Sequence, residues 1–154
     1  MRTFDQWMSE YQVSHNHPTN KLIHKIAVPL IVFSVIGILW CVPIPQAFKD
    51  VSPYLNWSTV FVGGSLVFYL LLNVVMFLSM VVSSGVMFWV CHQLYQTGTL
   101  MQLSLTIFVL AWALQFYGHK LEGKKPSFLK DLVFLLIGPL WVLRALYASL
   151  GIRI

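Results

Sequence analysis

The chain has 154 residues, of which 58% are hydrophobic, 15% aromatic and only 10% charged, with a net charge of +5. Soluble domains carry about 25% charged residues, so the composition indicates a membrane protein that crosses the bilayer several times. We expect residues 1–154 to form a single integral-membrane domain. The lysines lie in short clusters, which argues against nucleic acid as a partner and favours anionic lipid headgroups.

The N-terminal segment is polar and aromatic, and we expect no cleavable signal there, because no basic stretch leads into a short apolar core. Residues 3–14 carry an apolar stripe at helical spacing, which predicts an amphipathic helix that lies in the membrane interface or caps the bundle. The stripe consists of Phe4, Trp7, Met8 and Tyr11. Pro18 suits the first turn of a further helix, because its missing N–H would have no partner there.

Five apolar stretches follow, and they predict an all-α membrane bundle of about five transmembrane helices. The stretches cover residues 26–43, 55–72, 75–95, 100–117 and 132–150. The second and third are separated at Asn73, since roughly 20 residues suffice to cross the hydrocarbon core. Gly63–Gly64 and Ser83–Gly85 are expected to let helices approach closely. Cys41 and Cys91 lack a CxxC spacing and are expected to be packing residues.

The placement of Lys and Arg predicts an orientation. If the N-terminus faces the cytoplasm, most cationic residues fall on that side, and Lys49 and Arg153 fall on the other. The cytoplasmic group is Arg2, Lys21, Lys25, Lys120, Lys124, Lys125 and Lys130. Arg144 lies within the last stretch, where it either receives an anionic headgroup or carboxylate or has a structural partner such as Asp131 or a helix C-terminus.

Three of the five histidines follow a hydrogen-bonding side chain by one helical turn. The pairs are Tyr11 with His15, Asn20 with His24, and Gln115 with His119. Such a partner holds an imidazole in one orientation and one tautomer, as a metal ligand requires. The orientation above puts all three histidines on the cytoplasmic face, and the break at residues 16–18 allows the first two to converge. The sequence therefore suggests a metal site.

Glu122 extends the second motif, because Gln115, His119 and Glu122 share one helix face and Gly118 removes bulk beside it. Histidine with carboxylate is the ligand set of non-haem Fe(II) oxygenases, and three histidines with a water suit zinc equally well. Glu122 is therefore either a ligand or a group that orients His119. Taken singly, each histidine also fits an ordinary role in hydrogen bonding headgroups or helix ends.

The remaining polar residues carry weaker signals. His17 is expected at a helix N-terminus or the surface, with metal contact as the less favoured alternative. His92 is expected near the opposite face in a hydrogen-bonding or interfacial role. Lys120 and Lys124 are expected to be interfacial anchors, although either could attract a carboxylate.

The two motifs resemble those of the Mpo1-like family. They read Tyr11-x3-His15-x4-Asn20-x3-His24, followed by Pro29, and Gln115-x2-Gly118-His119-x2-Glu122-x3-Pro126. The resemblance extends over most of the chain, to Gly138–Pro139. Ala27, Ser127 and Arg144 depart from the family's pattern, with Arg144 standing where an acidic residue is common.

The resemblance implies a small membrane protein of the endoplasmic reticulum or a bacterial inner membrane. It implies an Fe(II)-dependent dioxygenase that uses O2 to shorten 2-hydroxy fatty acids by one carbon in α-oxidation. His15, His24 and His119 would hold the metal, and Tyr11, Asn20, Gln115 and Glu122 would support it. The resemblance is also compatible with a homo-oligomer.

Two other classes remain open from the residues. A zinc-dependent membrane lipid hydrolase would use the same ligands. In a non-enzymatic transporter or assembly protein, the histidines would only form hydrogen bonds.

Overall fold

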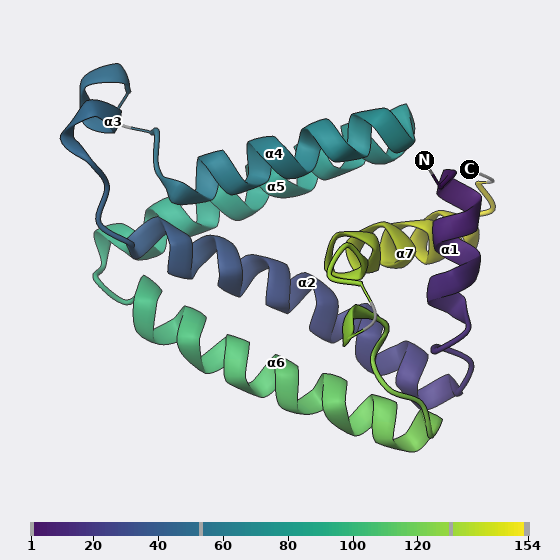
Figure 1. Ribbon diagram of the computed structural model, residues 1–154. Coiled ribbons are helices and arrows are strands. Elements are labelled where there is room, and N and C mark those ends of the chain that lie inside the picture. The colour runs from purple at the N-terminus through teal and green to yellow at the C-terminus, as the bar shows by residue number, and fades with distance from the viewer. Residues whose placement is uncertain (1, 53, 130, 153–154) are drawn as a thin grey trace. The chain divides into compact units, whose positions relative to one another are not determined.

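Figure 1 shows the computed structural model of the protein, which describes residues 2–52, 54–129 and 131–152. These residues form α-helices and one 3₁₀ turn, and none of them lies in a strand. The all-α prediction is therefore confirmed. Lys130 and Arg153, two of the cations used to predict the orientation, lie outside the described residues.

All five apolar stretches become helices, and the amphipathic helix precedes them. The helices are α1 (Phe4–Gln12), α2 (Pro18–Cys41), α3 (Gln46–Val51), α4 (Trp57–Leu72), α5 (Val74–Gln96), α6 (Leu100–Glu122) and α7 (Phe134–Ser149), with a 3₁₀ turn at Ser127–Leu129. Two helices extend well beyond their apolar stretches: α2 begins at Pro18, the predicted helix start, eight residues before its stretch, and α6 continues to Glu122. The short helix α3 was not predicted.

Among the described residues, three helices, α2, α5 and α6, are long and apolar enough to cross a membrane. They contain 24, 23 and 23 residues. At 1.5 Å per residue each reaches roughly 35 Å, which exceeds a hydrocarbon core of about 30 Å. The apolar helices α4 and α7 have 16 residues each, which corresponds to roughly 24 Å.

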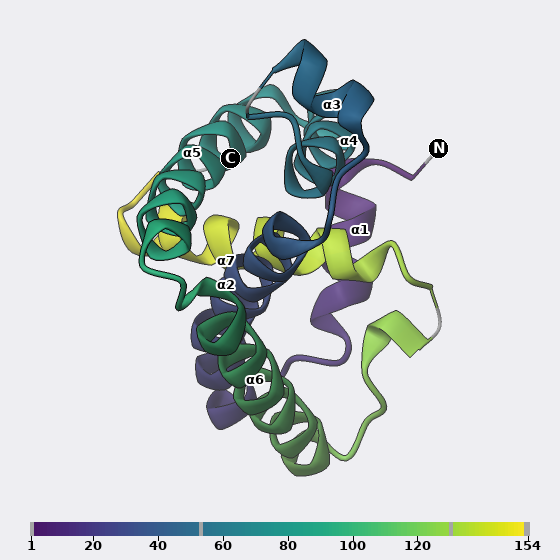
Figure 2. The same ribbon diagram turned by 90° about the vertical axis from the view of Figure 1, so that its left-hand side faces the viewer.

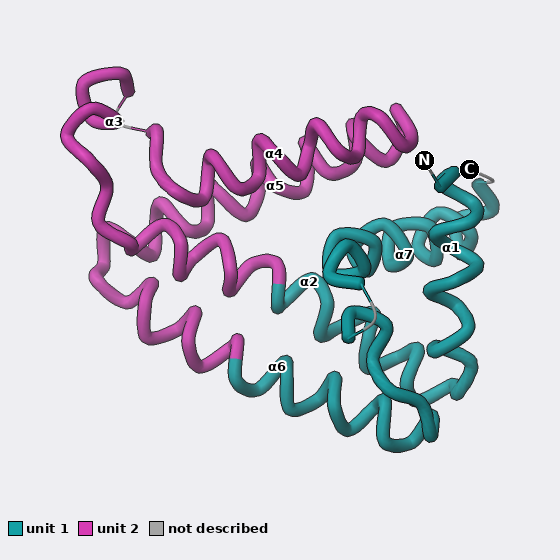
Figure 3. The backbone as a smooth tube through the Cα atoms, in the orientation of Figure 1, with its two compact units in different colours: residues 1–31, 109–154 teal, residues 32–108 magenta. Residues whose placement is uncertain are grey.

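The chain divides into two compact units, coloured separately in Figure 3. Unit 1 comprises residues 1–31 and 109–154, and unit 2 comprises residues 32–108. The helices α2 and α6 contribute to both. Each unit is described by itself below.

In unit 2, α4 and α5 lie side by side as a helical hairpin, as both ribbon views show (Figures 1 and 2). Asn73 ends α4 in an extended conformation and then caps α5. Its side-chain oxygen accepts a hydrogen bond from the Met76 N–H at 3.0 Å, which satisfies one of the unpaired donors at the new helix start. The predicted separation at Asn73 is confirmed.

In unit 2, Gly37 lets α2 approach α6 closely. A Cβ atom there would lie 3.1 Å from both Leu100 Cδ1 and Ser104 Cβ of α6 and would collide with Ser104 Oγ. At Gly63, Gly64 and Gly85 a Cβ would meet nothing within 4 Å, so the expectation that these glycines allow close packing was wrong. Both cysteines are free, and Cys91 is fully buried.

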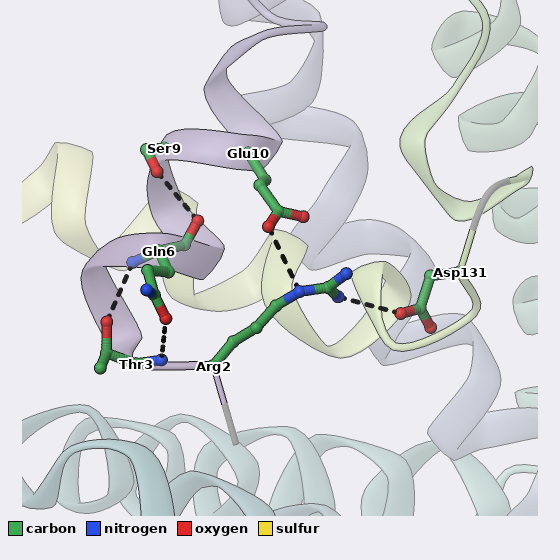
Figure 4. Close-up of polar contacts among 6 residues, drawn as sticks. All are labelled: Arg2, Thr3, Gln6, Ser9, Glu10 and Asp131. Carbon is green, nitrogen blue, oxygen red and sulfur yellow. Dashed lines mark hydrogen bonds and ion pairs between the residues drawn. The ribbon is translucent and has the colours of Figure 1, made fainter.

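In unit 1, α1 packs on α7 through its predicted stripe, all four residues of which are buried. Thr3 caps α1, and its own N–H donates to the Gln6 side-chain oxygen at 2.8 Å (Figure 4). Trp7 meets the Phe134 ring edge-on at 5.2 Å. The helix therefore covers part of the unit's core, one of the two placements expected for it.

Two arginines also connect α1 with the C-terminal segment. Arg2 pairs with Glu10 at 3.2 Å and with Asp131 at 3.3 Å (Figure 4). Arg144 pairs with Asp5 at 3.2 Å, so it has a structural partner, but that partner is a carboxylate other than Asp131. All of these side chains are partly exposed, and each pair contributes only about 0–1 kcal/mol.

Gly37→Ala should destabilise the folded protein, because the added methyl group would overpack the contact with Leu100 and Ser104. Overpacking of this kind costs about 1–3 kcal/mol. Thermal unfolding in detergent should show a lower midpoint for Gly37→Ala. The matched variant Gly63→Ala should unfold no earlier than the unmodified protein, and equal midpoints for the two variants would contradict the packing account.

Candidate metal centre

Three buried histidines of unit 1 come together. His15 follows α1 in the connection to α2, His24 lies on α2, and His119 lies in the last turn of α6. Their side chains are 0%, 1% and 5% exposed. Each offers a ring nitrogen within 4.8 Å of the other two. The structure therefore brings together the three residues that the sequence suggested as ligands.

Two of these rings are held by main-chain carbonyl groups one turn earlier. His15 Nδ1 lies 2.6 Å from the Tyr11 carbonyl oxygen, and His24 Nδ1 lies 2.9 Å from that of Asn20. Because a carbonyl only accepts, each Nδ1 carries the proton and each Nε2 keeps its lone pair. The expected i, i+4 support exists, but the backbone provides these hydrogen bonds rather than the side chain.

The separation of two of the nitrogens fits a bound metal. His24 Nε2 and His119 Nε2 are 3.2 Å apart, close to the roughly 3.3–3.4 Å that separates two tetrahedral ligands about 2.0–2.1 Å from one metal. His15 Nε2 is buried without a hydrogen-bond partner among the described residues. A buried acceptor without a partner costs about 1–3 kcal/mol. A cation bound by three imidazoles would satisfy it.

The surroundings of His15 keep its imidazole neutral. Burial lowers the pKa of this imidazole to about 4, because desolvation disfavours the charged form. The neutral ring is the form that binds metals.

Tyr11 orients the His15 ring from one side. The two rings stack with centroids 4.1 Å apart and planes 11° apart. Trp141 of α7 lies 5.7 Å from the Tyr11 ring. Gly138 gives the phenol room, since a Cβ there would lie only 3.1 Å from the Tyr11 hydroxyl. Burial also raises the pKa of Tyr11.

Asn20 links the surroundings of two histidines. Its side-chain amide donates to the Ser14 carbonyl at 3.1 Å and to Glu122 at 3.0 Å. Its own backbone carbonyl holds His24. Gly118 of α6 provides the space, because a Cβ at that position would collide with Asn20 Oδ1.

Gln115 is buried, and its side chain lies within reach of the His24 ring. The i, i+4 spacing predicts instead that Gln115 supports His119, which lies one turn along the same helix. The contact that the structure shows instead runs from α6 to α2.

Glu122 contacts the α1–α2 connection. It accepts hydrogen bonds from the backbone N–H groups of Asn16 at 2.9 Å and His17 at 2.8 Å. The group of possible metal ligands among the described residues consists of the three histidines and does not include this carboxylate.

The other polar candidates lie outside the cluster. His17 is exposed and accepts a hydrogen bond from the Thr19 N–H at 3.2 Å, in keeping with the helix N-terminus expected for it. Lys124 donates to the Val13 carbonyl at 2.8 Å, just past the end of α1. His92 belongs to unit 2, where its ring lies 6.4 Å from that of Trp40.

Gln12 is a part of this region that the sequence did not indicate. Its amide nitrogen donates to the His15 carbonyl at 2.5 Å, and its oxygen accepts from the Trp141 indole at 2.9 Å. Gln12 therefore connects the His15 backbone with α7. Nothing in its spacing distinguishes it from an ordinary surface glutamine.

A family model described as 2-hydroxy-palmitic acid dioxygenase Mpo1-like matches residues 1–150. The chain belongs to the Mpo1-like family. The match includes all three histidines and every residue that contacts them, and the description names a dioxygenase. No curated protein and no solved structure matches the chain.

Gly118→Ala should weaken metal binding although it changes no ligand. The new methyl group would displace Asn20, whose backbone carbonyl orients His24, and loss of such support costs about 10–100-fold in metal affinity. Titration of the metal-free protein with Zn²⁺ would measure this. Gly85→Ala, in open space on α5, should retain the original affinity. Unchanged affinity in Gly118→Ala would show that the contact does not support the site.

Proposed function

We propose that this protein is an Fe(II)-dependent dioxygenase that cleaves 2-hydroxy fatty acids in α-oxidation, releasing an acid one carbon shorter. The buried cluster of His15, His24 and His119 carries this proposal, in a chain whose family is described as a dioxygenase. In the reaction O2 accepts four electrons: the C1–C2 bond breaks, C2 becomes the new carboxyl carbon, C1 leaves as CO2, and one water is released.

The protein's own residues contribute to this chemistry by holding neutral imidazole nitrogens away from water. Main-chain carbonyls fix two imidazole tautomers, and Tyr11 fixes the plane of the His15 ring. Fe(II) bound there would supply Lewis acidity and redox chemistry toward O2. Three protein ligands leave room for the hydroxyl and carboxylate oxygens of a 2-hydroxy acid.

The membrane location suits an acyl substrate. We propose five crossings, with the shorter helices α4 and α7 included, and the histidines on the cytoplasmic side of an endoplasmic reticulum or bacterial inner membrane. Lys21 and Lys25 on α2 support this placement, since they alternate with exposed Leu22 and Ile26 as residues at a membrane interface do. An acyl tail would remain in the bilayer while its polar head reaches the histidines.

The same three nitrogens would also suit zinc. A zinc-dependent lipid hydrolase is therefore the second candidate. It differs in a simple way, because hydrolysis requires water and not O2.

His119→Ala should abolish O2-dependent turnover of 2-hydroxypalmitate, because it removes one of three nitrogens from the cluster. Oxygen uptake and the appearance of the shortened acid would be measured on detergent-solubilised protein loaded with Fe(II). His92→Ala is the matched control, since it removes a histidine of unit 2, and it should keep most of the activity.

Turnover in His119→Ala equal to that of the unmodified protein would contradict the proposal. Conversion of a lipid substrate at the same rate with and without oxygen would favour the hydrolase.

A further inference from the structure

The Glu122 carboxylate, at the last residue of α6, receives three N–H groups from one short segment. Asn16 N–H donates to one of its oxygens at 2.9 Å, and His17 N–H and Asn20 Nδ2–H donate to the other at 2.8 and 3.0 Å. A carboxylate that accepts three amide hydrogens has its acceptor positions directed toward the amides.

These donors lie next to the histidines in sequence. Asn16 directly follows His15, and Asn20 precedes His24 by one helical turn. Glu122 itself follows His119 by three residues on α6. One side chain therefore links the three segments that carry His15, His24 and His119, although more than 100 residues separate it from its partners.

The location also suits a negative charge. The helix α2 begins at Pro18, so the N–H groups of Asn16 and His17 lie just before its first turn. The first N–H groups of a helix lack partners within the helix, and its dipole favours an anion at this end. Hydrogen bonds to an ionised acceptor are roughly twice as strong as those between neutral groups.

We propose that Glu122 is a positioning residue that holds the three histidines at metal-binding separation by tying the end of α6 to the start of α2. It does so without contacting the metal. This inference rests on the proposed metal centre. We call the three hydrogen bonds that Glu122 accepts from Asn16, His17 and Asn20 the Glu122 clamp. Glu122→Gln replaces one acceptor oxygen with an NH2 group that would face another donor, so the clamp weakens while every ligand remains.

Co(II) provides a probe that reports affinity and ligand set together. Titration of the metal-free protein in detergent should give a dissociation constant about 10–100-fold higher for Glu122→Gln than for the unmodified protein, as for other groups that orient metal ligands. At saturation the visible absorption of bound Co(II) should be the same in both, because the ligands are the same. Glu10→Gln removes an equal charge from α1 and should bind Co(II) like the unmodified protein.

The conservative variant separates a specific role from general damage. Glu122→Asp keeps the charge and both oxygens but is shorter by one methylene, so its affinity should fall between those of Glu122→Gln and the unmodified protein. A changed Co(II) spectrum at saturation in Glu122→Gln would make Glu122 a ligand and overturn the inference. An unchanged dissociation constant would also overturn it.

Hydrogen exchange tests the clamp without any metal. Amides of residues 14–20 should exchange faster in Glu122→Gln than in the unmodified protein, and no faster in Glu10→Gln. Unchanged exchange in Glu122→Gln would overturn the clamp. If the unmodified protein binds no Co(II) but the exchange still accelerates, the proposed function fails and the clamp stands.

Discussion

The Nδ1–H groups of His15 and His24 each donate to the main-chain carbonyl one helical turn earlier. This arrangement makes the position of each ring depend on the helix that carries it. The rest of unit 1 then has to bring three helix ends together, with little freedom left for the imidazoles. The packing of α1 on α7 places His15, the start of α2 places His24, and the end of α6 places His119.

Burial gives the cluster its chemical character. Away from water, an imidazole stays neutral and its lone pair needs a partner, which His15 Nε2 does not find among the described protein atoms. Desolvation therefore both prepares the ligand and creates a cost that a cation would remove. The glycines at 118 and 138 have a related purpose, since they let Asn20 and Tyr11 approach helix backbones directly.

The sequence predicted features that depend on local spacing. The stripe of α1, the helix start at Pro18 and the break at Asn73 follow from periodicity and helix-end chemistry, and the structure confirms all three. The three histidines could be grouped because the alternation of membrane spans predicts which ends share a face. In the part of the chain that the structure describes, three apolar helices have the length to span a membrane, and the count of five remains a prediction.

Features that depend on contacts distant in the chain could not be predicted. The partners of Glu122 lie more than 100 residues away, and the pairs Arg2–Asp131 and Arg144–Asp5 join the two ends of the sequence. Whether a small residue permits close helix packing also depends on the neighbouring helix. A Cβ at Gly37 would meet α6, whereas a Cβ at Gly63 would meet nothing within 4 Å. The i, i+4 pattern indicated the support of His15 and His24 correctly but not that of His119, and spacing alone does not distinguish a side chain from the carbonyl of the same residue.

The most direct test of the metal centre is the iron content of anaerobically purified, detergent-solubilised protein, compared with His15→Ala and His24→Ala. The account predicts iron near stoichiometric with the unmodified chain and lost from both variants, while their helical circular dichroism is retained. Folded, unmodified protein that holds no iron, even after Fe(II) is added back, would contradict it.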